Sequence, residues 1–113
     1  MKTAGVVGFL GVALGAFGAH GLKGTVPDEM LDVWKTGVLY HLVHAVFLLV
    51  VTAPWPRRLA LVGIGLFSGS LYAMTLSGVK VLGAITPLGG LCFLAAWALL
   101  VTRRWGQASP GST

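Results

Sequence analysis

The stretch Trp34-Lys35-Thr36-Gly37-Val38-Leu39-Tyr40-His41-Leu42-Val43-His44 decides how this chain must fold. It opens a long apolar run, yet it carries two of the chain's three histidines together with a tyrosine and a tryptophan. Hydrocarbon offers no hydrogen bonds, so polar rings inside a bilayer must find partners within the protein. If this run crosses a membrane, other segments of the chain have to supply those partners.

The composition indicates a membrane protein. Hydrophobic residues make up 56% of the 113-residue chain and charged residues only 10%, whereas soluble domains carry roughly 25% charged residues. A domain of this size cannot bury so much apolar surface in a core of its own, so lipid must cover the remainder. The net charge of +5 is scattered between the apolar runs and forms no aromatic-interleaved basic patch, which argues against nucleic acid as a partner.

Four apolar runs predict an all-α, membrane-spanning four-helix bundle. We expect a single domain over residues 1–105, followed by a disordered tail over residues 106–113. Pro54-Trp55-Pro56 separates the second and third helices, and Thr86-Pro87 breaks the fourth as a capping residue followed by proline. A fourth helix that begins near Val79 and is kinked at Pro87 is the alternative. The expected helices cover residues 3–22, 27–53, 57–77 and 87–104.

Lys2 and the apolar run behind it also resemble a secretory signal peptide. The run is too long and too glycine-rich for a good signal core, so we expect it to remain as the first membrane helix.

The distribution of charge predicts the orientation. Four crossings place both termini on one side, and an excess of Lys and Arg marks the cytoplasmic side of a membrane protein. We therefore expect an inner-membrane protein with both termini in the cytoplasm. The basic residues on the side of the termini are Lys2, Arg57, Arg58, Arg103 and Arg104. The opposite side carries Lys23, Lys35 and Lys80 with all three acids, Asp28, Glu29 and Asp32.

Glycines recur at helical spacing in two of the runs. Small residues on one helix face let two membrane helices approach closely, although glycine is also common in membrane helices for no such reason. Two such faces leave a spare contact surface, so a homo-oligomer or a larger membrane protein is an expected partner besides lipid. The predicted packing glycines are Gly8, Gly11, Gly15 and Gly18 in the first run and Gly65 and Gly69 in the third.

Polar side chains of all four helices fall at similar depth. Ranking positions by the rise of about 1.5 Å per residue places them all in the outer half of the bilayer. The two histidines of the opening stretch share one helix face, and we expect them to point into the bundle. The candidate cluster is His20, Tyr40, His41, His44, Ser70, Tyr72 and Thr86.

Three interpretations of this cluster stay open. The first is a structural network of neutral imidazoles that fixes helix packing. The second is a metal or haem site, since histidine is a common ligand, although no carboxylate lies at this depth. The third is a pocket for a proton, a quinone or a small molecule. The absence of a mid-span acid or arginine argues against a proton-coupled exporter.

No nucleophile-and-base signature or phosphate-binding loop is found, and we predict neither an enzyme nor a bound cofactor or metal. We expect a structural or accessory membrane protein. The alternative is a binding or redox component with a histidine- and tyrosine-lined pocket for a small ligand, quinone, haem or metal.

Four motifs in order resemble one known family. Residues 15–22 (GAFGAHGL) and 34–45 (WKTGVLYHLVHA) are similar to the two front motifs of the YgdD-like inner-membrane proteins, of the UPF0382 type. Residues 67–72 (FSGSLY) and 85–90 (ITPLGG) are similar to the rear motifs. The resemblance covers about residues 5–105 and implies a four-span bacterial inner-membrane protein with a related eukaryotic transmembrane group. It implies no activity, because the function of that family is unknown.

Overall fold

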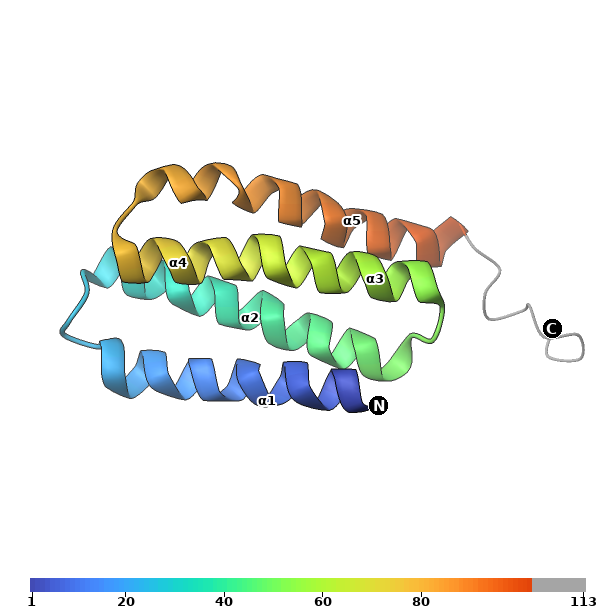
Figure 1. Ribbon diagram of the computed structural model, residues 1–113, viewed down its shortest axis with the longest axis horizontal. Helices are drawn as coiled ribbons and strands as arrows, with labels where there is room; N and C mark the ends of the chain where they lie inside the picture. The colour runs from blue at the N-terminus through green and yellow to red at the C-terminus, as the bar shows by residue number, and fades with distance from the viewer. Residues whose placement is uncertain (103–113) are drawn as a thin grey trace, which may run out of the picture.

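The computed structural model describes residues 1–102 of the chain (Figure 1). Within these residues four helices are long and apolar enough to cross a membrane, which confirms the predicted all-helical, four-span fold. The expected boundary residues Arg103, Arg104 and Trp105 and the tail over residues 106–113 lie outside the described residues.

The first two spans are α1 (Lys2–Phe17), prolonged by a π-helical turn (Gly18–Leu22), and α2 (Asp28–Val50). The third span joins α3 (Pro54–Gly63), a π-helical turn (Ile64–Ser68) and α4 (Gly69–Ser77) into one rod. A short 3₁₀ helix (Lys80–Ala84) then leads into α5 (Thr86–Thr102).

The junction between α2 and α3 differs from the expected one. α2 ends at Val50, before the expected residue 53, and α3 begins at Pro54 instead of residue 57. Proline is well tolerated at the first helical position, where its missing N–H would have had no helical partner. Arg57 then donates from its guanidinium to the Leu48 and Val51 carbonyls, which satisfies carbonyl groups at the end of α2.

The fourth span is interrupted just before Pro87. Gly78 ends α4 in the left-handed conformation, with φ 74°, and Val79 is extended. The segment that follows is 3₁₀ and not α-helical, and the α-helix begins at Thr86. The alternative, an α-helix that begins near Val79 and is kinked at Pro87, is therefore wrong.

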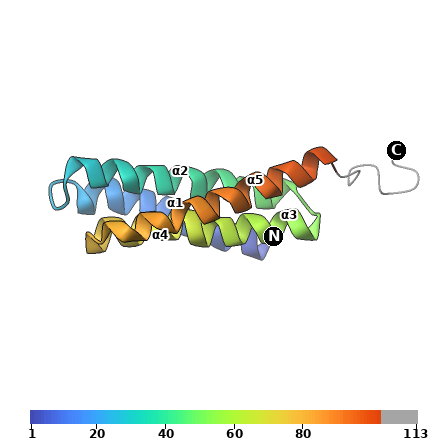
Figure 2. The same ribbon diagram turned by 90° about the horizontal axis from the view of Figure 1, so that it is seen from above.

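The spans lie side by side in the order α1, α2, third span, α5, with the N-terminus and the end of α5 at the same end (Figure 1). Seen from above, α5 crosses at an angle between α2 and the third span (Figure 2). Small alanines allow close packing at the end that holds the N-terminus. The core there consists of Ala4, Phe47, Leu48, Val51, Ala53, Ala60 and Ala96.

Candidate functional site

The glycine stripe of α1 packs against α2 in a regular antiparallel register. A Cβ added at Gly11 would lie 2.6 Å from the Leu42 side chain, and one at Gly18 would lie 2.5 Å from the Trp34 ring. A side chain at Gly18 would overlap the rigid Trp34 ring, and one at Gly11 would have to displace the Leu42 methyl groups, so glycine favours the close approach at both positions. The facing pairs are Gly8 with Ala45, Gly11 with Leu42, Gly15 with Val38, and Gly18 with Trp34.

This close approach brings backbone carbonyls of α1 within reach of side chains on α2. Trp34 Nε1 donates to the Leu14 carbonyl over 2.8 Å, and His41 Nε2 donates to the Val7 carbonyl over 2.8 Å. Each acceptor lies four residues before one of the contact glycines, where a side chain would otherwise cover it. Glycine therefore makes these hydrogen bonds possible as well as the packing.

His41 uses its second ring nitrogen to reach the third span. Its Nδ1 lies 2.9 Å from the Tyr72 hydroxyl. Because the Val7 carbonyl can only accept, Nε2 carries the proton, and Nδ1 accepts from Tyr72. His41 is 5% exposed and thus links α1, α2 and α4 through one neutral imidazole.

His44 also uses both ring nitrogens, and one of them bonds to α5. Its Nδ1 donates to the Tyr40 carbonyl over 2.8 Å, and its Nε2 accepts from Trp97 Nε1 over 3.1 Å. An indole nitrogen only donates, so the proton of His44 is on Nδ1, opposite to that of His41. The ring also stacks on Phe93, with centroids 3.7 Å apart.

Hydroxyls of the third span complete the network. Ser68, in the π-helical turn, donates to the Gly37 carbonyl over 2.7 Å, and Thr75 donates to the Met30 carbonyl over 3.2 Å. The hydroxyls of Ser70 and Thr86 lie 2.5 Å apart and tie the third span to the start of α5. Among residues 1–102, no buried side-chain nitrogen or oxygen lacks a hydrogen-bond partner.

The structure brings five of the seven candidate residues into contacts between spans, but in separate bonds and not in one cluster: His41 with Tyr72, His44 with Trp97, and Ser70 with Thr86. His20 is exposed at the end of the first span. Tyr40 contributes its carbonyl to His44, while its ring is 40% exposed.

Four positions of the hydrogen-bond network, Trp34, Ser68, Thr75 and Trp97, were not in the candidate cluster. Thr75 lies seven residues after Ser68, two helical turns along the same face, and this spacing was the signal that could have found it. Trp97 is one more indole in an apolar run, and nothing in the sequence distinguishes it.

The close contact of the third span falls on different glycines from those expected. A Cβ at Gly65 would meet nothing within 4 Å, and one at Gly69 would meet only its own helix. Gly63 faces Phe93 instead, and a Cβ at Gly89 of α5 would overlap the Phe67 backbone. The third span and α5 therefore approach through Gly63 and Gly89.

The ring nitrogens of His41 and His44 are all occupied by internal partners, so a metal or haem iron would have to displace one of these hydrogen bonds. Within residues 1–102, no group of three or more His, Cys, Asp or Glu side chains is placed to hold a metal ion. The hydrogen bonds of this arrangement join the four spans to one another.

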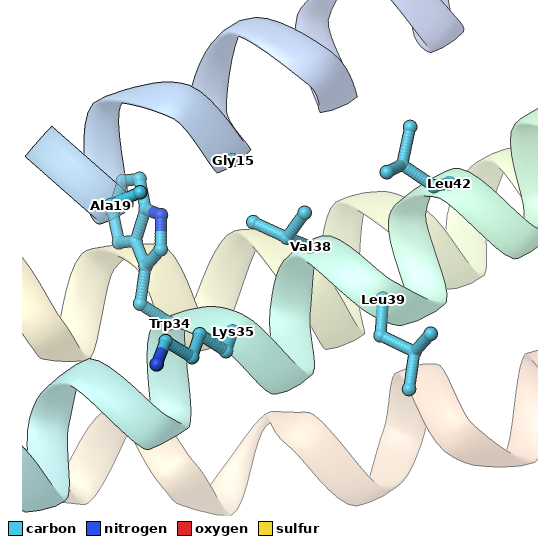
Figure 3. A pocket seen from close by; sticks show the side chains of 7 residues that line it. All are labelled: Gly15, Ala19, Trp34, Lys35, Val38, Leu39 and Leu42. Carbon is cyan, nitrogen blue, oxygen red and sulfur yellow. The ribbon is translucent and has the colours of Figure 1, made fainter.

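Two apolar grooves border the network. The first, of 330 Å³, lies between α1 and α2, where Trp34 rises from α2 beside Ala19 and Lys35 is the charged residue of the lining (Figure 3). The second, of 490 Å³, lies between α2 and α5 and is lined largely by aromatic rings.

Four membrane-spanning helices joined by buried hydrogen bonds define a small polytopic membrane protein. The chain belongs to the family described as "Protein of unknown function (DUF423)", which matches residues 14–90. It is 49% identical to the UPF0382 membrane protein YwdK of Bacillus subtilis, over 81% of this chain and 84% of that protein. It is 40% identical to the UPF0382 membrane protein SH2409 of Staphylococcus haemolyticus, over 81% and 83%. These relatives confirm the UPF0382 resemblance; no solved structure matches.

Proposed function

We propose that this protein is a structural or accessory component of the bacterial inner membrane that acts through contacts with helices and lipid. The observation that carries the proposal is the full internal use of both buried imidazoles. Hydrogen bonds between membrane helices contribute about 0.6 to 2 kcal/mol each. Together, such bonds fix the register of the spans. The outer faces of the helices then remain available for contacts with lipid or with other membrane helices.

We further propose that both termini face the cytoplasm. The end of the bundle that holds the N-terminus also holds Lys2, Arg57 and Arg58. The opposite end holds the other lysines of the described chain together with its acids, and such an excess of Lys and Arg at one end is typical of the cytoplasmic side.

The proposed partner is a second copy or a larger membrane protein besides lipid. Gly65 and Gly69 support this proposal, because within residues 1–102 a Cβ at either glycine would meet no atom of another span within 4 Å. Small residues on a lipid-facing helix permit the close approach of another helix.

A second candidate function, a ligand-binding component, is favoured by the aromatic groove between α2 and α5, which Tyr40 and His44 line. Metal- or haem-dependent versions of this candidate have less support, because His44 already shares both nitrogens with Tyr40 and Trp97.

The two candidates are separated by examining purified protein together with histidine variants. The structural proposal expects no Soret band and no stoichiometric zinc. It also expects a lower melting temperature for His41→Ala and His44→Ala, with His20→Ala as the matched control because His20 is exposed. A bound haem or zinc that both buried-histidine variants lose would contradict the proposal.

A further inference from the structure

The groove between α2 and α5 has the size and lining of a small-molecule site. Its volume of 490 Å³ lies within the range of about 300 to 1,000 Å³ of ligand pockets. Tyr40 and His44 of α2 face Phe93 and Trp97 of α5 across it, and Phe67 of the third span also lines it. Its lining residues Leu91 and Leu94 lie on the exposed face of α5, so a ligand can reach the groove from the lipid.

Tyr40 lines this groove and carries a hydroxyl. It lies eight residues beyond Asp32, the last acid of α2, which is about 12 Å along the helix at 1.5 Å per residue and places it in the apolar part of the span. Its ring is 40% exposed, and its hydroxyl makes no hydrogen bond within residues 1–102. In the apolar part of a span an unpaired hydroxyl is costly, because hydrocarbon supplies no acceptor. A ligand that brings an acceptor removes that cost.

Three of the rings that line the groove, Tyr40, His44 and Phe93, lie in nearly parallel planes, whereas Phe67 is tilted by 48° against Tyr40. The planes of Tyr40 and Phe93 differ by 16°, those of Tyr40 and His44 by 13°, and those of His44 and Phe93 by 10°. His44 and Phe93 are stacked on each other and buried, so the rings open to a ligand are Tyr40, which is 40% exposed, and Trp97, which is 46% exposed. Another planar ring stacks favourably on such an aromatic face. A saturated acyl chain would gain neither this stacking nor the hydrogen bond to the hydroxyl.

We infer that this groove binds the planar headgroup of a membrane quinone. The Tyr40 hydroxyl donates to a ring carbonyl, the ring stacks against the aromatic lining, and the apolar tail leaves past Leu91 and Leu94 into the lipid. Leu91 is 62% exposed and Leu94 67%, which leaves this path open. The inference names the ligand class of the second candidate function and rests on that candidate. It does not depend on the structural proposal, because it uses the hydroxyl that the internal network leaves out.

Gly90 allows the groove to be filled without disturbing the packing. A Cβ at Gly90 would lie 3.8 Å from the Phe67 ring, an ordinary contact, so the longer side chain of Gly90→Leu extends into the groove that Gly90 lines. Gly5→Leu adds the same side chain on α1, away from the groove, where nothing lies within 4 Å. The two variants form a matched pair that differs in whether the groove is blocked.

The experiment titrates purified protein in detergent with a short-chain ubiquinone analogue and follows tryptophan fluorescence, because Trp97 lines the groove and a quinone ring beside it quenches the indole. We expect saturable quenching for the native protein and for Gly5→Leu, and its loss for Gly90→Leu at an unchanged melting temperature. Tyr40→Phe should weaken binding about three- to tenfold, the effect of one lost hydrogen bond.

Three results would overturn the inference. Quenching that rises linearly without saturation, equally in both leucine variants, means that the quinone only partitions into the micelle. Equal affinity of Tyr40→Phe means that the hydroxyl holds no ligand. Complete displacement by a phospholipid at the same concentration as the quinone analogue means that the groove is an acyl-chain site.

Discussion

Trp34 and His41 lie seven residues apart on α2, and they donate to two α1 carbonyls, of Leu14 and Val7, that are also seven residues apart. Seven residues make nearly two helical turns, so both donors point from one face of α2 and both acceptors lie on one face of α1. Two hydrogen bonds of the same kind therefore join α1 and α2, and together they fix the axial register between the two helices.

The opposite relationship holds between α2 and the third span. There α2 supplies the carbonyls, of Met30 and Gly37, and the third span supplies the hydroxyls, of Thr75 and Ser68. Both pairs are again seven residues apart. α2 therefore determines the register of its neighbours on two sides, as a donor toward α1 and as an acceptor toward the third span.

Replacement of Gly11 by leucine should separate α1 from α2. The first added carbon would already lie 2.6 Å from Leu42 and 3.1 Å from the His41 ring. Overpacking of this kind costs about 1 to 3 kcal/mol, which a thermal or denaturant unfolding measurement in detergent detects.

Gly5→Leu is the control on the same helix, because a Cβ at Gly5 would meet nothing within 4 Å. Its free energy of unfolding should stay within about 0.5 kcal/mol of the native value. Equal destabilisation by the two leucines would show that loss of glycine in α1, and not the contact with α2, causes the effect.

A double-mutant cycle tests the hydrogen bond between His41 and Tyr72. We expect a coupling free energy of about 0.5 to 1.5 kcal/mol between His41→Ala and Tyr72→Phe, as for other hydrogen bonds between membrane helices. The pair His20→Ala and Tyr72→Phe should be additive, because His20 is exposed at the end of the first span. Additivity in the His41 cycle would argue that the 2.9 Å contact contributes nothing to stability.

Arg57 and Arg58 are adjacent but should behave differently. The Arg57 guanidinium donates to the Leu48 and Val51 carbonyls at the end of α2, whereas Arg58 lies 5.0 Å above the exposed Trp55 ring. Arg57→Ala should cost about 1.5 to 3 kcal/mol, and Arg58→Ala about 0.5 to 1 kcal/mol. The unfolding free energies of the two variants provide the measurement; the reverse order would contradict the proposed role of Arg57.

The proposed orientation predicts which loops react with a membrane-impermeant maleimide. In a Cys92→Ala background, Val79→Cys should be labelled in intact spheroplasts and Thr52→Cys only after permeabilisation. Both positions are exposed, and they lie at opposite ends of the bundle. The opposite labelling pattern would place the termini outside the cytoplasm.

The sequence predicted the four spans because each is a long apolar run bounded by glycine, proline or charge. It also indicated that His41 and His44 need internal partners, since polar rings in hydrocarbon are costly when unpaired. The partners themselves were only partly predictable. Tyr72 is a polar residue at the right depth, but the Val7 carbonyl becomes an acceptor only through the close packing at a glycine.

The rotation of the third span about its own axis explains why the expected and the observed packing glycines differ. Gly63 and Gly65 are two residues apart, so they point about 200° apart around an α-helix, and only the packed structure shows which one faces α5. The third span also contains a π-helical turn, Ile64–Ser68, which shifts the phase of the residues behind it. No periodicity in the sequence marks that turn.

The most direct test of the account is the tautomeric state of the two buried histidines, measured by nitrogen-15 NMR on histidine-labelled protein in which His20→Gln removes the third ring. We predict two neutral rings of opposite form, with the proton on Nε2 of His41 and on Nδ1 of His44. Two rings of the same form, rings that exchange between forms, or nitrogens shifted by a bound metal would contradict the claim that these imidazoles hold the bundle together.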